Sequence, residues 1–259
     1  MLKYLAFLEH KFFGKSIPEF LDLIEYKSDK YWVFLDTETT GLPSDSNEIQ
    51  LTQVSCIVVK YNFESNSFKE VNVFNKKIKL TNTTLDLMKQ PENRIKKVLS
   101  FNHYGQKGVE FHEEENVLSE LFEFLKPYDS PILVIQNAIF DMRYLNTRHP
   151  IVKFDNEVID TKQILQLFYL PALQTLSEKD EKYKKIVDKI GTSDRDNGLI
   201  SSSLGNVGPA LGINMSGYHD ALVDCRLAMD LFKVIINFLK IHKDIDIIKY
   251  QSERVRKLK

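Results

Sequence analysis

The stretch YWVFLDTETTGLP, residues 31–43, is rich in the residue types of a β-strand and is ended by Gly41 and Pro43. Because side chains alternate across a strand, every second residue points to the same face. One face of this strand carries Trp32, Phe34, Asp36 and Glu38. The strand is therefore hydrophobic where it starts, and its two acids lie side by side where it ends.

Two further strand-like runs follow, IQLTQVSCIVVKY at 49–61 and EVNVFNKKIKL at 70–80, with the polar turn FESNS between them. With the first strand they predict a three-strand antiparallel meander. Helical spacing then covers 83–100 and 113–126, followed by a strand at 131–136, a helix at 138–149, a short strand near 157–159 and a helix from about 161 to 170. The predicted fold class is α/β, a mixed sheet in which parallel strands extend the meander and helices flank it.

One catalytic domain at 31–240 is the predicted organisation of the 259 residues. Residues 1–30 are predicted to be a helical extension of two short helices, with Pro18 opening the second. Residues 171–203 are predicted to be an insertion, charged and helical at first and polar and mobile in its second half. Residues 241–259 are predicted to be a basic tail.

Composition excludes several classes of protein. With 35 Lys+Arg against 36 Asp+Glu the net charge is −1, which argues against coating of duplexes by bulk electrostatics. Cys56 and Cys225 have no CxxC spacing, so neither a disulfide framework nor a thiolate zinc site is predicted, and we expect a reducing, cytoplasmic setting. Charged residues interrupt the apolar N-terminus at 9–11, so we predict no signal peptide and no membrane partner.

Two further carboxylates occupy positions that a hydrophobic core would normally hold. Asp224 lies in the apolar stripe of the last predicted helix, about 218–239, and the nearest cation in sequence, Arg226, points to another face. Asp141 lies on the inward side of the helix after the strand 131–136. A buried carboxylate is costly unless it is paired or binds a metal, so each is either a salt-bridge or cap residue or a metal ligand.

Two polar residues accompany these acids. Asn137 directly precedes its helix, and we predict that it caps the helix N-terminus. His219 stands just before the last helix or in its first turn. A neutral imidazole is the side chain best suited to take a proton from water near pH 7.

Together, the segments DTETTGL at 36–42, NAIFD at 137–141 and HDALVD at 219–224 resemble the three motifs of the DEDDh, or DnaQ-like, 3′-to-5′ exonuclease family. The resemblance runs in the right order from about Trp32 to Leu239. It departs from the family at Gln136, where a small residue or histidine is usual, and in the charged insertion. It implies a ribonuclease H-like fold, in agreement with the meander and the alternating helices and strands.

The resemblance also implies the chemistry of the site. Two divalent cations, Mg²⁺ or Mn²⁺, would be bound by Asp36, Glu38, Asp141 and Asp224, with Asp36 bridging both. Two ions roughly 3.5–4 Å apart would activate a water and stabilise the leaving 3′-oxygen, releasing nucleoside 5′-monophosphates. His219 would take the proton of that water.

The turn after Glu38 would, by the same resemblance, hold the terminal nucleotide through Thr39, Thr40 and Leu42. Phe140 would stack near the strand end, and Asn137 would also contact substrate. Leu42 and Phe140 are equally good candidates for the core.

Several alternatives remain open on the sequence alone. The substrate is either DNA, which we favour as single-stranded 3′ ends, or RNA, since the catalytic set does not contact the 2′-position. A non-catalytic proofreading-type subunit is the rival to an enzyme, and a protein partner is possible but not indicated. The lysines of 179–189 either form a solvated face or belong to a lid that meets the strand's phosphates.

Overall fold

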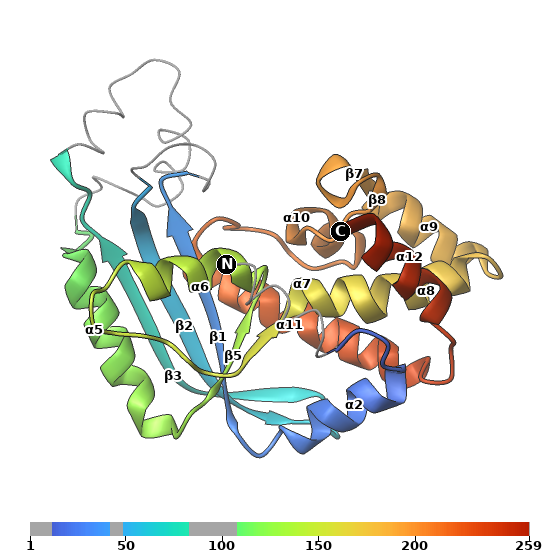
Figure 1. Cartoon of the computed structure of the whole chain (residues 1–259), viewed down its shortest axis with the longest axis horizontal. Coiled ribbons are helices and arrows are strands. Elements are labelled where there is room, and N and C mark those ends of the chain that lie inside the picture. Colours follow the sequence, from blue (N-terminus) through green and yellow to red (C-terminus); the bar gives the residue numbers. More distant parts are fainter. Residues whose placement is uncertain (1–11, 42–48, 83–107, 259) are drawn as a thin grey trace.

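The computed structural model describes residues 12–41, 49–82 and 108–258, without the side chain of Arg195. A six-stranded sheet in the order β4-β3-β2-β1-β5-β6 forms its centre (Figure 1). The long strands are β1 (Tyr31–Thr39), β2 (Leu51–Asn62) and β3 (Ser67–Ile78), and the short ones are β4 (Phe111–His112), β5 (Ile132–Ile135) and β6 (Val158–Asp160).

Strand directions confirm the predicted mixed sheet. β1 pairs with β2 and β2 with β3 in antiparallel fashion, while β5 runs parallel to β1 and β6 parallel to β5. This is the ribonuclease H-like arrangement. The edge strand β4, parallel to the end of β3, was not predicted, because its two residues are too few to show a periodicity.

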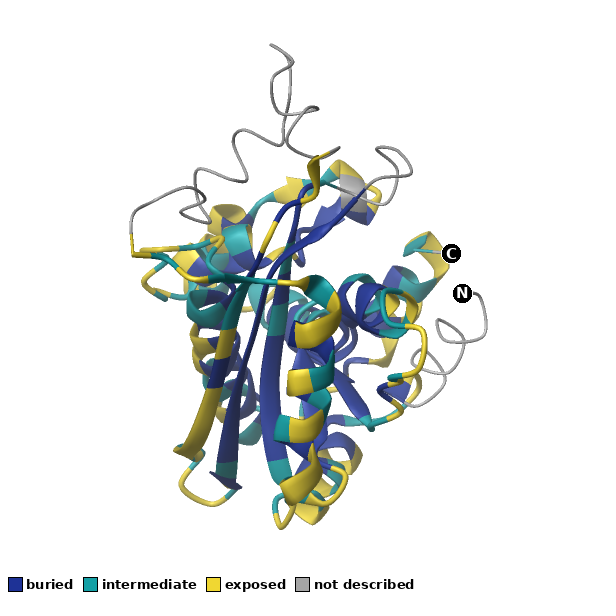
Figure 2. Ribbon diagram, turned by 90° about the vertical axis from the view of Figure 1, so that its left-hand side faces the viewer, coloured by how far each residue is buried: buried dark blue, intermediate teal, exposed yellow. Residues whose placement is uncertain are grey.

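Helices cover both faces of the sheet. The face of Trp32 and Phe34 packs against α2 (Ile17–Tyr26) and α11 (Ala221–Ile241), and the face of Val33 and Leu35 packs against α5 (Glu114–Leu125) and α6 (Ala138–Thr147). In Figure 2 the central strands are mostly dark blue, and yellow exposed residues lie on the outer sides of the helices, in the turns and along β3. The two acids of β1 therefore continue the face that α11 covers.

The helix expected to end near Leu170 continues to Ser177. It consists of α7 (Thr161–Ile164), a π-helical turn η2 (Leu165–Tyr169) and α8 (Leu170–Ser177), and the N–H of Leu170 donates to the carbonyl of Leu165. Pro171 lies in the first turn of α8, directly after this wide turn. A proline has no N–H to donate to the preceding turn, and here it follows the turn of the helix whose hydrogen bonds are already irregular.

The polar second half of the predicted insertion has regular secondary structure, and its expected mobility stays a prediction. After α9 (Glu181–Ile190), strands β7 (Thr192–Ser193) and β8 (Leu199–Ile200) form an antiparallel hairpin, and α10 (Leu204–Ala210) follows. Ser201 and Ser202 are fully buried. Asp196 accepts hydrogen bonds from the backbone N–H and hydroxyl of Ser202 at 2.8 and 3.0 Å, which satisfies the polar groups that made this segment look like a loop.

Both flanks of the predicted domain share its core. Phe20 of α2 stacks on Phe168 at 4.2 Å between ring centroids. Pro18 lies in the first turn of α2, as predicted, and Ser16 caps the helix. The predicted basic tail contains the helix α12 (Ile248–Leu258), in which Gln251 and Arg254 are buried.

The remaining expectations for the fold concern smaller features. Short 3-10 turns at Lys126–Tyr128 (η1) and Asp194–Asp196 (η3) complete the elements. The helices predicted within 1–11 and at 83–100 lie outside the described residues. No helix in the described part of the chain has the length and apolar character needed to span a membrane.

Candidate active site

Asp36 and Glu38 lie at the carboxyl end of β1, both half-buried, on the face that α11 covers. Their alternation with buried Thr37 and Thr39 follows the strand period as predicted. The strand ends here because its pairing with β2 shifts register between Glu38 and Thr39. The hydrophobic start of β1 is thus buried in the core, and its acidic end opens towards the surface.

Asp141 is positioned by the opposite side of the same strand. Its carboxylate oxygen Oδ1 accepts hydrogen bonds from the backbone N–H and the hydroxyl of Thr37, at 2.8 and 2.7 Å. The residue is only 2% exposed and lies in the first turn of α6. Thr37 therefore fixes Asp141 from between Asp36 and Glu38, a role that the sequence analysis did not assign.

Asp224 and His219 are joined at the start of the last helix. α11 begins at Ala221, so His219 precedes it, with the left-handed backbone angle φ of 77°. The N–H of His219 donates to both carboxylate oxygens of Asp224 at 3.3 Å. A non-glycine residue with positive φ is uncommon, and such conformations gather at functional sites. Arg226 pairs with Glu70 on the outer face, as its sequence position predicted.

These residues converge. Ligand atoms of Glu38, His219 and Asp224 all lie within 4.8 Å of one another. Asp36 and Asp224 line one pocket of about 230 Å³, together with Asn137, Tyr218 and Lys162. The structure therefore brings the predicted acids and histidine from three distant segments to one place.

Burial and crowding raise the pKa values of all four carboxyls. Burial raises the pKa of Glu38 to about 9, helped by the charges of Asp224 and Asp141. Burial likewise raises the pKa of Asp141 and of Asp224 to about 7, in each case against hydrogen bonds that favour the charged form. Burial and the neighbouring acids raise the pKa of Asp36 well above its ordinary value. A site with this charge pattern gains from a bound cation.

No described lysine or arginine neutralises this cluster. Lys162 lines the pocket but donates to the Asn137 side chain at 3.3 Å, and Lys77 lies 3.8 Å from Asp220. Clustered carboxylate oxygens are the donor set that Mg²⁺ and Mn²⁺ prefer. The residues present therefore fit divalent cations of this kind.

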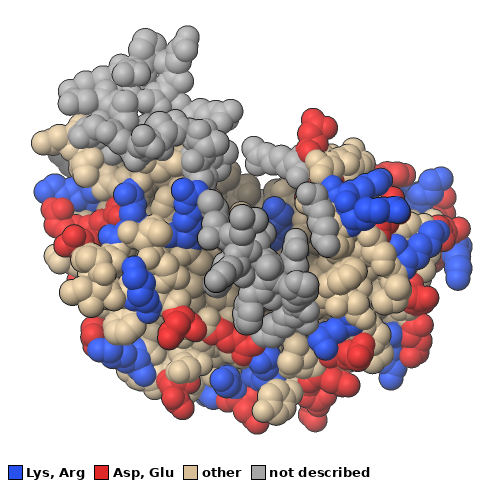
Figure 3. Space-filling model, in the orientation of Figure 1, with Lys and Arg blue, Asp and Glu red and all other residues tan. Residues whose placement is uncertain are grey.

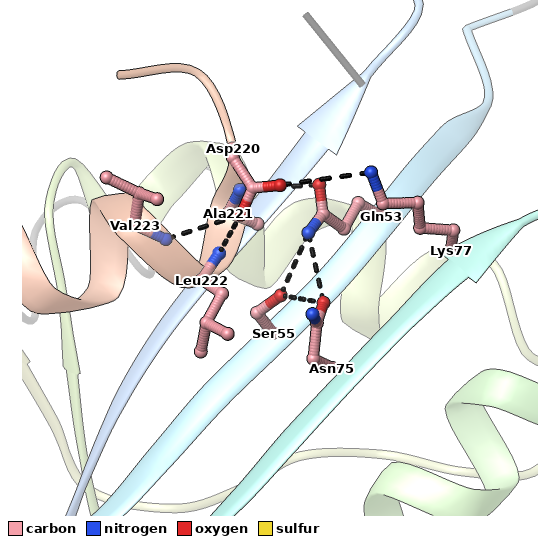
Figure 4. A network of polar contacts seen from close by, with 8 residues as sticks. All are labelled: Gln53, Ser55, Asn75, Lys77, Asp220, Ala221, Leu222 and Val223. Atoms are coloured by element: carbon pink, nitrogen blue, oxygen red, sulfur yellow. Dashed lines mark hydrogen bonds and ion pairs between the residues drawn. The ribbon is translucent and has the colours of Figure 1, made fainter. Parts of the chain in front are cut away.

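A polar network ties the start of α11 to the sheet (Figure 4). Asp220 caps the helix by accepting from the N–H groups of Leu222 and Val223, and the N–H of Ala221 donates to Gln53 of β2. Gln53 is fully buried, pairs with Glu38 across the sheet and donates to Asn75 at 3.0 Å. The distance between Asp224 and the strand acids is thus set by hydrogen bonds across three elements.

The structure places most of the predicted substrate residues, but not all of them at the acids. Thr39 and Thr40 are buried and hold the turn after β1, through the Gly41 carbonyl and the Gln50 N–H. Phe140 is half-buried and packs on Tyr144 with ring centroids 5.1 Å apart, whereas Asn137 lines the pocket of the acids. Leu42 lies outside the described residues.

The expected capping role of Asn137 is wrong, because its side chain makes no cap bond and its backbone is left-handed. The cap of α6 is Asp160, at the end of β6. Its carboxylate accepts from the N–H groups of Asn137, Ala138 and Lys162, at 3.0, 3.0 and 2.9 Å. An aspartate between a strand and a helix is a local cap signal, which could have identified Asp160 from the sequence as the cap of α7 but not of α6.

Gln136, the departure from the family pattern, has partners of its own. The hydroxyl of Thr161 donates to its side-chain oxygen, and its side-chain nitrogen donates to the carbonyl of Ser202 at 3.4 Å. The larger residue thus links β5 to the α7 start and to the segment after the β7-β8 hairpin.

Residues 25–243 match the family model described as DNA polymerase family B, exonuclease domain. The chain belongs to this family. It is an exonuclease domain of the DEDDh type, so the family predicted from the three motifs is confirmed. No curated protein sequence matches the chain.

Among solved structures, this exonuclease domain is similar to E. coli exonuclease I in complex with a dT13 oligonucleotide, at 19% identity and a TM-score of 0.51. That match covers 82% of this chain and 41% of the other, so the domain spans less than half of exonuclease I. The nuclease domain of 3′hExo, a DEDDh family member bound to rAMP, matches at 12% identity and a TM-score of 0.48, covering 84% of this chain and 96% of that one.

Proposed function

We propose that this domain hydrolyses the terminal phosphodiester at the 3′ end of a nucleic-acid strand and releases nucleoside 5′-monophosphates. The observation that carries the proposal is the convergence of the predicted acids and His219. Asp36 and Asp224 line one pocket, Glu38 and His219 lie close to Asp224, and the charge of Asp141 acts on Asp36. The membership of a DNA polymerase exonuclease family supports single-stranded DNA as the substrate, with RNA as the alternative.

In this proposal Asp36, Glu38, Asp141 and Asp224 bind two divalent cations, Mg²⁺ or Mn²⁺. When bound, such ions promote deprotonation of the attacking water and stabilise the leaving 3′-oxygen. Thr37 holds Asp141 in its ligating orientation, and the capped start of α11 does the same for Asp224. Hydrogen bonds of this kind keep a ligand oriented and charged.

His219 takes the proton of the attacking water. Its side chain is exposed at the rim of the pocket, where the ring stacks on Tyr218 at 4.0 Å between centroids. The carboxylate of Asp224 binds its backbone, so the ring is held beside the acids without being buried among them. The ring also lies close enough to Glu38 and Asp224 to be a third ligand of a cation. Loss of the ring would weaken metal affinity if His219 is a ligand, but not if it only takes the proton.

The direct test is a time course on single-stranded DNA labelled at its 3′ end or at its 5′ end, with Mg²⁺ and with matched RNA. Release of labelled mononucleotide from the 3′-labelled strand at the earliest times, with a ladder of shortened 5′-labelled products, supports the proposal. Asp224→Asn is expected to abolish release. Asp230→Asn, an exposed aspartate further along the same helix, is the matched control and is expected to keep it. Mononucleotide from the 5′ end would contradict the proposal.

A further inference from the structure

A second hollow adjoins the pocket of the acids. It has a volume of about 190 Å³ and shares Asn137, Lys162 and Asp196 with the acid pocket. From these shared residues it continues to Val255 and Leu258 of α12. The two hollows together form a groove that leads from Asp36 and Asp224 to the C-terminal helix.

The chemistry along the groove changes in a way that suits a nucleotide chain. The end at Asp36 and Asp224 is acidic, and the far end has apolar side chains of Ile139, Leu167, Val255 and Leu258 with the amides of Gln163 and Gln166. The carboxylates of Asp160 and Asp196 also line the second hollow, where both accept hydrogen bonds from neighbouring groups of the protein. Apolar surface with interspersed amides matches sugars and bases, whereas phosphates need a cation.

Lys162 supplies that cation at the junction. Of the described residues that line either hollow, it is the only lysine or arginine. Its backbone N–H is fixed by Asp160, and its ammonium group donates to Asn137 at 3.3 Å, so it is held half-buried between the two hollows. A phosphate bound by this ammonium group would be the next one along the strand from the phosphate at the acid cluster.

The far wall of the groove is built into the fold. Arg254 of α12 is 1% exposed and donates to the carbonyl of Ile200 at 2.9 Å, and buried Gln251 donates to the carbonyl of Leu167 at 3.0 Å. Asn197 of the β7-β8 hairpin donates to the carbonyl of Lys257. α12 is thus fixed at both ends of the segment that faces the groove.

Positive charge lies at the open end of this wall. Arg256 and Lys257 are exposed in the last turn of α12, and Figure 3 shows blue side chains gathered over that region. α12 lies beyond residues 25–243, the part that matches the family model. This wall of the groove is therefore a feature of this chain outside the matched domain.

We propose that the groove binds the single strand on the 5′ side of the scissile phosphate, with Lys162 on the next phosphate and the following nucleotide against Val255 and Leu258. This inference rests on the proposed exonuclease function. It predicts that α12 contributes to a preference for long strands over short ones, because a dinucleotide would occupy only the acid pocket.

The test compares kcat/KM on a dinucleotide with kcat/KM on a strand of about ten nucleotides. Leu258→Glu places a carboxylate against the strand, and we expect the long-to-short ratio to fall about tenfold, the loss typical of one stacked or repelled nucleotide. Ile241→Glu makes the same change at an exposed site at the far end of α11, and the ratio is expected to stay at the wild-type value.

Salt dependence tests the phosphate contact separately. Lys162→Gln is expected to lower the slope of log affinity against log salt for the long strand by about 0.7, the loss of one phosphate contact on a single strand. Lys126→Gln, which removes an exposed lysine near the start of β5 at the other end of the sheet, leaves the slope unchanged.

Unchanged ratios in Leu258→Glu and an unchanged slope in Lys162→Gln would overturn the inference. Affinity of the long strand is measured by fluorescence anisotropy of a labelled strand, which needs no hydrolysis. If the strand binds in a way that depends on Lys162 and Leu258 but no nucleotide is released, the proposed function is refuted and the proposed strand-binding groove stands. If nucleotide is released but binding does not depend on these residues, the groove is refuted and the proposed function stands.

Discussion

Replacing Thr37 by valine removes one hydroxyl from the active site at nearly constant side-chain volume. That hydroxyl donates to Asp141 at 2.7 Å, and Thr37 is 5% exposed, so water cannot replace it. A hydrogen bond to a charged group contributes about 1.5–3 kcal/mol. Since about 1.4 kcal/mol corresponds to a factor of ten, the affinity for Mg²⁺ or Mn²⁺ should fall by roughly 10- to 100-fold.

The expected direction follows from the charge of Asp141. Its pKa, already raised to about 7 by burial, would rise further without the hydroxyl, so a smaller fraction would be ionised and ready to bind a cation. The backbone N–H of Thr37 still donates to the same oxygen, so we expect a weakened site and not a lost one.

The assay is the thermal shift produced by increasing Mn²⁺, with the metal dependence of nucleotide release measured alongside. Binding to the folded state stabilises it by an amount that grows with the ratio of ligand concentration to Kd. Thr147→Val makes the same substitution at the other end of α6, where the hydroxyl donates to the carbonyl of Arg143, and serves as the control. Equal titration midpoints in Thr37→Val and wild type would refute the positioning role of Thr37.

Three further predictions concern the acids and the histidine. The amide substitutions Asp36→Asn, Glu38→Gln, Asp141→Asn and Asp224→Asn should each abolish nucleotide release. Each should leave the metal-free melting temperature equal or higher, because it relieves the repulsion between the acids. Full release in any one variant would remove that residue from the catalytic set. His219→Ala should lower kcat by roughly 10²–10⁴-fold with the Mn²⁺ midpoint unchanged, and a weaker midpoint would make His219 a ligand. In metal-free buffer the free energy of unfolding should fall as the pH rises, since the folded carboxyls keep protons that unfolded ones release near 3.8 to 4.5. That contribution is complete below about pH 4 and is lost through about pH 7 to 9, so a stability that increases over this range would contradict the raised pKa values.

Much of the site could be predicted because strand and helix periods are local. The alternation of β1 placed Asp36 and Glu38 on the α11 face, and the apolar stripe of α11 placed Asp224 towards the sheet. A charged residue at a position that the strand or helix period predicts to be buried can be recognised from the sequence alone. The resemblance of the three motifs then supplied the family that the family model confirms.

The positioning residues could not be predicted in the same way, because their partners are distant in sequence. Asp160 caps a helix that begins 22 residues earlier in the chain, and Gln53 binds the N–H of Ala221 across 168 residues. The assignment of Asn137 as a cap failed for the same reason, since a competing acceptor arrives from a neighbouring strand. Polar composition gave no sign of the elements within 191–203, where buried hydrogen bonds to Asp196 replace contact with water.

The order of the acids along the chain has a consequence for synthesis. Asp36 and Glu38 are made early, whereas His219 and Asp224 are held by the start of α11, whose contacts with β2 form only after most of the domain has been translated. Because residues 219–224 supply both the histidine and the fourth carboxylate of the proposed catalytic set, a nascent or truncated chain lacking them would carry only three of the four proposed ligands. Under the proposed mechanism, recovery of nuclease activity on refolding would therefore report the docking of α11 onto the sheet.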